Sequence, residues 1–326
     1  KIYDELVELE KQSGIIIAGS PTQQVGYEIL SELPKEIHPS RMLSLDKTKS
    51  RDELKEWLGN HQGILSWKLD GLTIVLTYDD GKLIKAVTRG NGDVGEVITP
   101  NAKTFVNLPH QIAYKGNLVI RGEAVISYAD FEKINSEIEE NAGKYKNPRN
   151  LCAGSVRQLN SEITASRRIR FFAFTLVSAS DISFKTRSEQ MKWLAEQGFD
   201  TVTERLVNAD NIVETVDLFE SEVQENPIPS DGLVLAFDDL EYSASLGTTA
   251  KFPRDSIAFK WQDQTEKTVL REIEWNASRT GLINPIAVFD PVELEGTTVS
   301  RASVHNLSIV EELALGIGDT IEVYKA

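Results

Sequence analysis

Apolar residues recur three or four positions apart over the first sixty residues, which is the period of a helix with one buried face. This period predicts helices over residues 2–11, from Ser20 to about residue 33, and from Ser50 to residue 58. Ser50 and Glu53 have the spacing of a capping box, and Pro21 suits the first turn of the second helix. The chain therefore opens with helical segments.

The period changes to two near residue 64, and apolar positions that alternate with polar ones predict strands. The strands expected in this part of the chain cover residues 64–68, 72–78, 82–88, 118–126, 232–237 and 256–261. Asp80-Gly81 separates the second and third of them as a two-residue hairpin turn. Helical periods return between the strands, near residues 128–140, 188–197 and 210–222. This mixture predicts an α+β fold.

The last sixty residues are mostly strand and turn. About four strands are expected after residue 267, with a turn at Gly296 and a short helix near residues 306–315. A small closed barrel usually needs five strands. We therefore expect an all-β segment that forms part of a barrel.

Composition narrows the class of protein. The chain has 326 residues, of which 40% are hydrophobic and 26% charged, and its one cysteine is Cys152. This length predicts two or three domains with sizeable cores. One cysteine excludes an internal disulfide framework and a cysteine-rich zinc site, and it fits a reducing compartment. No apolar run reaches the roughly 18 residues of a membrane span. We therefore expect a globular protein without a membrane partner.

Charge is unevenly distributed. The net charge of −15 argues against binding of nucleic acid over the whole surface. Residues 144–170, which we call the basic segment, hold seven basic side chains and one acid, Glu162. Five of the seven are arginines, whose guanidinium fork suits phosphate. From its charge, the basic segment is either a solvated loop or a phosphate-binding surface.

The candidate chemistry begins at Lys68-Leu69-Asp70-Gly71, which lies in an apolar strand. Side chains two apart on a strand share a face, so Lys68 and Asp70 are expected to point the same way. A lysine there is either a salt-bridged structural residue or a nucleophile. An unperturbed lysine is almost wholly protonated at neutral pH, and burial or a nearby cation would release the attacking amine.

Four other stretches carry polar groups of the same kind. They are Arg121-Gly122-Glu123, Asn147-Pro148-Arg149-Asn150 with Arg157 further on, Asp231-Gly232, and Phe259-Lys260-Trp261. Each alone fits a structural role. A carboxylate, a second lysine and paired arginines in one chain with Lys68 are much harder to explain by structural roles alone.

Taken in order, these motifs resemble the nucleotidyltransferase core of bacterial NAD-dependent DNA ligases. Further matching motifs are Met42–Leu45, Thr88–Gly90, Ala153–Ser155, Arg157–Leu159, Arg279–Gly281, Gly296–Ala302 and His305-Asn306. The resemblance implies an α+β nucleotidyltransferase fold of antiparallel sheets with helices, similar to ATP-grasp. It implies three parts: residues 1–37 from a helical nicotinamide-binding domain, residues 38–266 as the nucleotidyltransferase domain, and residues 267–326 as a partial OB-fold.

The same resemblance implies a three-step reaction. Lys68 attacks the α-phosphate of NAD, releases nicotinamide mononucleotide and becomes lysyl-AMP. The AMP then passes to the 5′-phosphate of a DNA nick, and the 3′-hydroxyl displaces it to seal the nick. The implied partners are NAD, Mg²⁺ or Mn²⁺, and nicked double-stranded DNA. We expect a monomer that works in the bacterial cytoplasm, at the nucleoid.

The resemblance also assigns roles to individual residues. Catalytic roles fall on Lys68, Asp70, Glu123, Asp231 and Lys260. Contacts with AMP fall on Ser44, Leu45, Gly71, Arg89, Glu123, Phe174 and Lys260, with Glu123 on the ribose and Phe174 stacked on adenine. Tyr3 and Asp4 would bind the nicotinamide mononucleotide half of NAD. Arg149 and Arg157 would contact DNA phosphates. No metal ligands are assigned.

Two positions depart from the family pattern. A glutamate is usual two residues before the nucleophile and a lysine is usual five residues after Asp231, but this chain has Ser66 and Ala236. Both positions line the adenine end of the family's pocket, so weaker discrimination of adenine is expected. Two alternatives stay open: a catalytically weakened homologue that binds nucleotides or nucleic acids, and an ATP-dependent nucleotidyltransferase.

Overall fold

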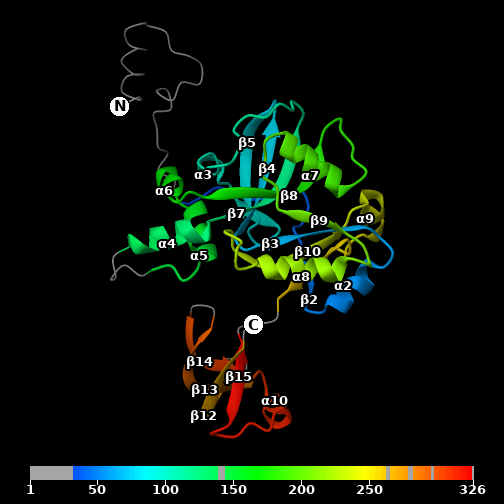
Figure 1. Ribbon diagram of the computed structural model, residues 1–326. Coiled ribbons are helices and arrows are strands. Elements are labelled where there is room, and N and C mark those ends of the chain that lie inside the picture. The colour runs from blue at the N-terminus through cyan, green and yellow to red at the C-terminus, as the bar shows by residue number, and fades with distance from the viewer. Residues whose placement is uncertain (1–31, 139–143, 262–264, 278–281, 295–296, 325–326) are drawn as a thin grey trace. The chain divides into compact units, whose positions relative to one another are not determined.

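The structure, a computed structural model, describes residues 32–138, 144–261, 265–277, 282–294 and 297–324 (Figure 1). The chain divides into two compact units, Lys1–Leu33 and Pro34–Ala326. The helices expected over residues 2–11 and from Ser20, with the predicted ligands Tyr3 and Asp4, lie outside the described residues. None of the described helices is long and apolar enough to cross a membrane.

The first large sheet, which we call the lysine sheet, has five strands. Their order is β2 (Asp46–Thr48), β11 (Ser256–Lys260), β10 (Ser230–Phe237), β3 (Gly63–Leu69) and β9 (Glu204–Val207). All neighbouring pairs are antiparallel except β2 with β11. The sheet brings together segments that are far apart along the chain, and two of them carry the predicted lysines.

One face of the lysine sheet is a hydrophobic core. Leu65 and Trp67 of β3 and Leu233 and Leu235 of β10 are buried in one cluster. The helices α2 (Arg51–Leu58) and α8 (Ile212–Glu222) contribute further buried members of this cluster, and Figure 1 shows them beside the sheet. Because alternate strand residues enter this core, Ser66 and Lys68 lie on the opposite face.

The second large sheet, which we call the glutamate sheet, has four antiparallel strands. Their order is β5 (Lys82–Thr88), β4 (Leu72–Asp79), β7 (Leu118–Val125) and β8 (Arg170–Ala179). Asp80 and Gly81 join β4 to β5 with φ angles of 46° and 73°. These left-handed values are those of a tight hairpin turn, so the hairpin expected from Asp80-Gly81 is confirmed.

Smaller elements connect and cover the two sheets. The strands β1 (Lys35–Ile37) and β6 (Val94–Glu96) form a two-stranded sheet. The remaining helices are α3 (Thr99–Ala102), α4 (Tyr128–Ser136), α5 (Pro148–Val156), α6 (Ser161–Ser166), α7 (Arg187–Glu196) and α9 (Leu240–Leu246). The helix expected over residues 128–140 is confirmed as α4 but is shorter, because its C-cap is Glu137.

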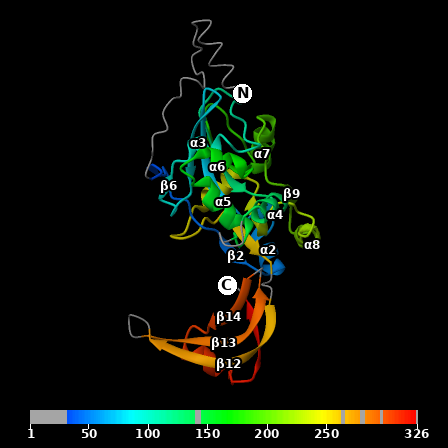
Figure 2. The same cartoon turned by 90° about the vertical axis from the view of Figure 1, so that its left-hand side faces the viewer.

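The C-terminal strands form a separate four-stranded antiparallel sheet. Their order is β14 (Thr297–Ser303), β13 (Ile283–Leu294), β12 (Thr265–Ala277) and β15 (Thr320–Tyr324), with α10 (Leu307–Glu312) before the last strand. Figure 2 shows the long strands β12 and β13 side by side. This sheet has its own core, built around Leu270 and Phe289. The four strands and short helix expected here are confirmed.

Candidate active site

Asp231 holds the two predicted lysines together. Lys68 Nζ donates to Asp231 Oδ1 at 2.7 Å and to Oδ2 at 3.0 Å. Lys260 Nζ donates to Asp231 Oδ2 at 2.5 Å. Burial alone would raise the pKa of Asp231, but the two ammonium groups outweigh burial and lower it. The three side chains therefore form a partly buried cluster in which the carboxylate is ionised.

A β-bulge in β10 puts Asp231 in this position. Ser230 pairs with Leu69 and Leu233 pairs with Trp67, so β10 has one more residue than β3 across the same interval. Gly232 has a φ of 149°, and a Cβ there would lie 2.1 Å from the carbonyl oxygen of Phe259. Only glycine fits this contact. The bulge at Asp231-Gly232 thus brings the Asp231 carboxylate opposite Lys68.

Glu123 of β7 faces Lys68 from the glutamate sheet. Its carboxylate accepts a hydrogen bond from Thr73 Oγ1 at 2.9 Å and another from the backbone of Gly71. Burial raises its pKa to about 7, and Thr73, Lys68, Arg149 and Gly71 offset part of that rise. Lys68 and Glu123 thus come from different sheets and interact electrostatically. The site lies where the two sheets approach each other.

Asp70 and Gly71 make the turn from one sheet to the other. Asp70 Oδ1 accepts a hydrogen bond from Arg149 Nη1 at 2.7 Å, so Asp70 and Lys68 have different partners. A Cβ on Gly71 would lie 2.0 Å from the carbonyl oxygen of Ala124, a contact that only glycine allows. Arg149 stands at the start of α5, which Asn147 caps by accepting from the backbone N–H of Asn150. The helix thus holds Arg149 next to Asp70.

The remaining predicted nucleotide contacts come from the edges of the sheets. Arg89 Nη2 donates to Ser44 Oγ at 3.1 Å, so these two residues are brought together. Leu45 is half-buried and directly precedes β2, the neighbour of the strand that ends in Lys260. No distance places Leu45 at Lys68.

Phe174 occupies a second β-bulge. Ala173 pairs with Gly122 and Thr175 pairs with Arg121, which leaves Phe174 as the extra residue of β8. Bulges re-aim side chains, and the ring of Phe174 is 39% exposed. The ring is therefore available to stack on a flat partner.

The sequence decides the family. Residues 30–264 match the family model of the NAD-dependent DNA ligase adenylation domain, and residues 267–326 match that of the NAD-dependent DNA ligase OB-fold domain. The chain belongs to the NAD-dependent DNA ligase family.

Relatives in this ligase family match along the whole chain. The DNA ligase of Lachnoclostridium phytofermentans is 65% identical over 327 residues, which cover 100% of this chain and 50% of that protein. The DNA ligase of Ruminiclostridium cellulolyticum is 64% identical with the same coverage, and that of Pediococcus pentosaceus is 39% identical over 99% of this chain and 50% of its own length. The chain spans about half the length of the curated relatives it matches.

The basic segment of the chain is partly neutralised by acids outside it. Arg157 Nε lies 2.8 Å from Glu96 Oε2, and Arg168 Nε lies 3.0 Å from Asp130 Oδ1. With the Arg149–Asp70 pair, three of its arginines have carboxylate partners. The segment is also largely helical, because α5 and α6 lie in it. The solvated-loop interpretation is therefore wrong for most of its length.

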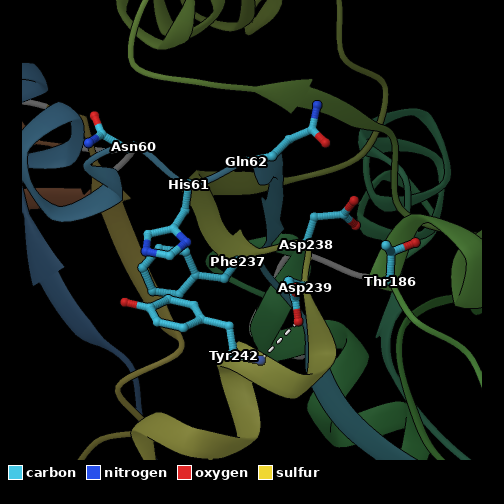
Figure 3. Close-up of a pocket in the computed structure, with 8 residues that line it drawn as sticks. All are labelled: Asn60, His61, Gln62, Thr186, Phe237, Asp238, Asp239 and Tyr242. Carbon is cyan, nitrogen blue, oxygen red and sulfur yellow. Dashed lines mark hydrogen bonds between the residues drawn. The ribbon is translucent and has the colours of Figure 1, made fainter.

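A separate cavity lies away from these residues. Its volume is about 290 Å³, and Figure 3 shows the ring of His61 against that of Tyr242 inside it. These rings stack with centroids 3.9 Å apart. The lining residues are Asn60, His61, Gln62, Thr186, Phe237, Asp238, Asp239 and Tyr242. None of the predicted ligase site residues is among them.

The acidic residues of the site do not form a cation cage. Asp231 binds two lysines and Asp70 binds an arginine. Within the described ranges, no group of three or more His, Cys, Asp or Glu side chains could hold a metal ion. The described side chains alone do not fit a resident Mg²⁺ or Mn²⁺.

Sequence reasoning missed Thr73, which fixes the Glu123 carboxylate. Thr73 pairs directly with Glu123 between β4 and β7. A signal was present, because Thr73 and Thr77 alternate with the buried Ile74 and Leu76 and therefore lie on the other face of the strand. The pairing with Glu123, 50 residues later, could not be read from that alternation.

Proposed function

We propose that this chain is the part of a DNA ligase that takes AMP from NAD onto Lys68. The observation that carries the proposal is the Lys68–Asp231–Lys260 cluster opposite Glu123, in a chain that belongs to the NAD-dependent ligase family. A lysine beside a second cation and a buried carboxylate is the arrangement that nucleotidyl transfer needs.

In the first step, Lys68 Nζ forms a bond to the α-phosphorus of NAD, and the phosphoanhydride bond to nicotinamide mononucleotide breaks. The Lys68 ammonium must lose a proton before it attacks. Asp231 already accepts hydrogen bonds from Lys68, so it is the nearest carboxylate to that proton. Lys260 would offset the negative charge that develops on the phosphoryl oxygens.

Glu123 and Phe174 would hold the nucleoside. A buried carboxylate suits the ribose hydroxyls, which are hydrogen-bond donors, and an exposed aromatic ring suits the base. Ser44, Leu45, Gly71 and Arg89 would complete the AMP contacts. Asp70 would act through Arg149, whose position it fixes.

The later steps involve DNA. AMP would pass to the 5′-phosphate of a nicked duplex, and the 3′-hydroxyl would displace it as the nick is sealed. Arg149 and Arg157 would contact phosphates of the nicked strand, which would have to replace their present carboxylate partners. We extend the proposal to a monomer that serves replication and repair in the bacterial cytoplasm at the nucleoid, and to Mg²⁺ or Mn²⁺ that arrives with the nucleotide phosphates.

Intact-protein mass spectrometry tests the first step. The chain is incubated with NAD and Mg²⁺, with ATP in a parallel sample and Lys68→Ala as the control. One AMP adduct from NAD, absent from the variant, is the expected result. An adduct from ATP alone would favour an ATP-dependent nucleotidyltransferase. No adduct from either nucleotide would favour a nucleotide-binding homologue without catalysis.

A further inference from the structure

Thr73 lies directly opposite Glu123 on the neighbouring strand of the glutamate sheet. The two residues pair between β4 and β7, and Thr73 Oγ1 donates to Glu123 Oε2 at 2.9 Å. Both side chains are half-buried, on the face opposite to the buried Ile74 and Leu76. A carboxylate can accept about four hydrogen bonds. Thr73 and the backbone of Gly71 therefore leave acceptor capacity on Glu123 for a ligand.

The Thr73 hydroxyl also affects the charge of Glu123, because a hydrogen bond to a carboxylate favours its ionised form. Burial has the largest effect on Glu123 and raises its pKa to about 7. Among the groups that lower this pKa again, the Thr73 hydrogen bond has a larger effect than the charges of Lys68 and Arg149. Near pH 7, where Glu123 is about half ionised, the loss of one such bond changes the charge of the site.

The other groups around Glu123 come from its own strand, the next strand and α5. Phe172, its partner on β8, is apolar. Burial, with Glu123 and Asp70 after it, raises the pKa of the Cys152 thiol, which stays neutral. Asp70 is ion-paired with an arginine of α5. Burial lowers the pKa of Arg121 on β7, but an arginine stays protonated in proteins. A dependence of ligand binding on pH near 7 is therefore assigned to Glu123.

We propose that Thr73 is a positioning residue for the nucleotide, whose hydroxyl keeps Glu123 ionised at neutral pH and so able to hold the ribose. This inference rests on the proposed function, in which Glu123 binds the ribose of AMP. The ribose hydroxyls donate hydrogen bonds, and a carboxylate accepts them more strongly than a neutral carboxyl group does. Without the Thr73 hydroxyl, more of Glu123 is protonated at pH 7 and the ribose is held less well.

A substitution can remove the hydroxyl and leave the backbone contacts of Thr73 in place. The Thr73 carbonyl accepts from the N–H of Arg89 at 2.9 Å, and the Arg89 side chain bonds to Ser44. Valine has the shape of threonine and suits a strand, so Thr73→Val keeps β4 and this contact. Thr77→Val is the matched control, because Thr77 is half-buried on the same face of β4 but pairs with Val119.

Calorimetric titration over a range of pH tests the proposal on the 326-residue chain. The probes are AMP and 2′,3′-dideoxy-AMP, which lacks both ribose hydroxyls. The ratio of their affinities isolates the ribose contact, because both probes carry the same titrating phosphate. In wild type this ratio should rise as the pH passes through about 7 and Glu123 ionises.

In Thr73→Val the same rise should come about one pH unit higher. The ratio should therefore be about fivefold below wild type at pH 7 and return to within about twofold at about pH 9. Thr73→Ser, which keeps a hydroxyl, and Thr77→Val should follow wild type. If Thr73→Val does not fold, Thr73→Ala takes its place with the same expected shift.

A carbon-13 NMR titration of the side-chain carboxyl groups, with Glu123→Gln to assign the signal, follows the ionisation directly. Its midpoint for Glu123 should lie at higher pH in Thr73→Val than in wild type. An unchanged midpoint would overturn the proposal. So would an AMP-to-dideoxy-AMP ratio that falls equally at every pH, since a packing defect does not recover in base.

Adduct formation from NAD, measured by mass, tests the proposed function separately. An adduct together with unchanged pH curves in Thr73→Val contradicts this inference alone. Shifted pH curves in a chain that forms no adduct support this inference and contradict the proposed transfer of AMP to Lys68.

Discussion

At the scale of single residues, two carboxyl groups with opposite environments surround Lys68. Asp231 is ionised because two lysines outweigh its burial. Glu123 has its pKa raised to about 7 because burial outweighs its partners. The first group keeps the lysines in place, and the second keeps a partly protonated carboxyl group ready for a ligand. The site therefore carries a net positive charge that suits a phosphate.

The raised pKa of Glu123 makes stability depend on pH. The folded pKa of about 7 lies above the ordinary value of 4.5, so the stability that neutral Glu123 contributes is fully present below about pH 4.5 and is lost as the pH rises through 7. Glu123→Gln has no such group. The free energy of unfolding of Glu123→Gln, relative to that of wild type, should therefore rise by up to about 3 kcal/mol between pH 5 and pH 8.

Thermal unfolding of both proteins at the two pH values measures this difference, with Glu132→Gln on the exposed surface of α4 as the control. A difference that stays constant with pH would contradict the raised pKa. The same variant should form far less AMP adduct from NAD, because it loses the carboxylate proposed to hold the ribose.

Arg149 and Arg157 are expected to differ although both are proposed to contact DNA. Arg149 is bonded to Asp70, beside Lys68, whereas Arg157 pairs with Glu96 of β6. Arg149→Ala should slow adenylation by NAD and weaken binding of nicked duplex. Arg157→Ala should weaken DNA binding alone. Adduct formation by mass spectrometry and DNA binding by fluorescence anisotropy separate the two effects, and equal adenylation rates in both variants would contradict this distinction.

At the scale of elements, bulges rather than regular strands set the site. The extra residue in β10 brings Asp231 opposite Lys68, and the extra residue in β8 is Phe174 itself. A regular ladder would alternate these side chains strictly between the two faces. Each bulge therefore releases one predicted site residue from the strict alternation of its strand.

Gly232→Ala tests the bulge in β10. Its Cβ would overlap the Phe259 carbonyl oxygen, so a loss of about 2–4 kcal/mol of stability and a sharp fall in adenylation are expected. Gly198→Ala is the matched control, because Gly198 also has a positive φ, of 94°, but nothing lies within 4 Å of its added Cβ. Gly198→Ala should lower the free energy of unfolding by only about 1 kcal/mol. Equal losses in chemical denaturation would show that backbone strain, not the overlap, sets the cost.

Local signals in the sequence predicted some elements well. The Asp80-Gly81 hairpin and the helix capped by Ser50 are confirmed, because a turn or a cap is fixed by residues within four positions. The helix α5 was not predicted, although Asn147-Pro148 is a cap followed by proline, because the charge of the whole basic segment was compatible with a loop. The Lys68–Asp231 contact spans 163 positions and depends on a bulge, so no local pattern could predict it.

At the scale of the whole molecule, an acidic chain is proposed to bind an acidic polymer. The net charge is −15, and three arginines of the basic segment are paired with carboxylates. DNA phosphates would compete with those carboxylates for the same guanidinium groups. DNA binding should therefore depend on how readily these guanidinium groups exchange a carboxylate partner for a phosphate.

Salt dependence measures how many cations take part. With about four phosphate contacts, affinity for a nicked duplex should fall by roughly a hundredfold between 50 and 200 mM salt. Arg157→Ala should reduce the slope by about one contact. A salt-independent affinity would show that the basic segment does not bind the DNA backbone.

The strand order of the lysine sheet also affects how the protein folds. Neighbouring strands in this sheet come from residues 46–48, 63–69, 204–207, 230–237 and 256–260. Such non-local pairings slow folding, because long loops must close, at a cost in entropy, before the strand contacts can stabilise the sheet. During synthesis, Lys68 leaves the ribosome well before Asp231 and Lys260 are made. The nascent chain therefore carries Lys68 without its partners, and the Lys68–Asp231–Lys260 cluster forms only when the last strand of the sheet is added.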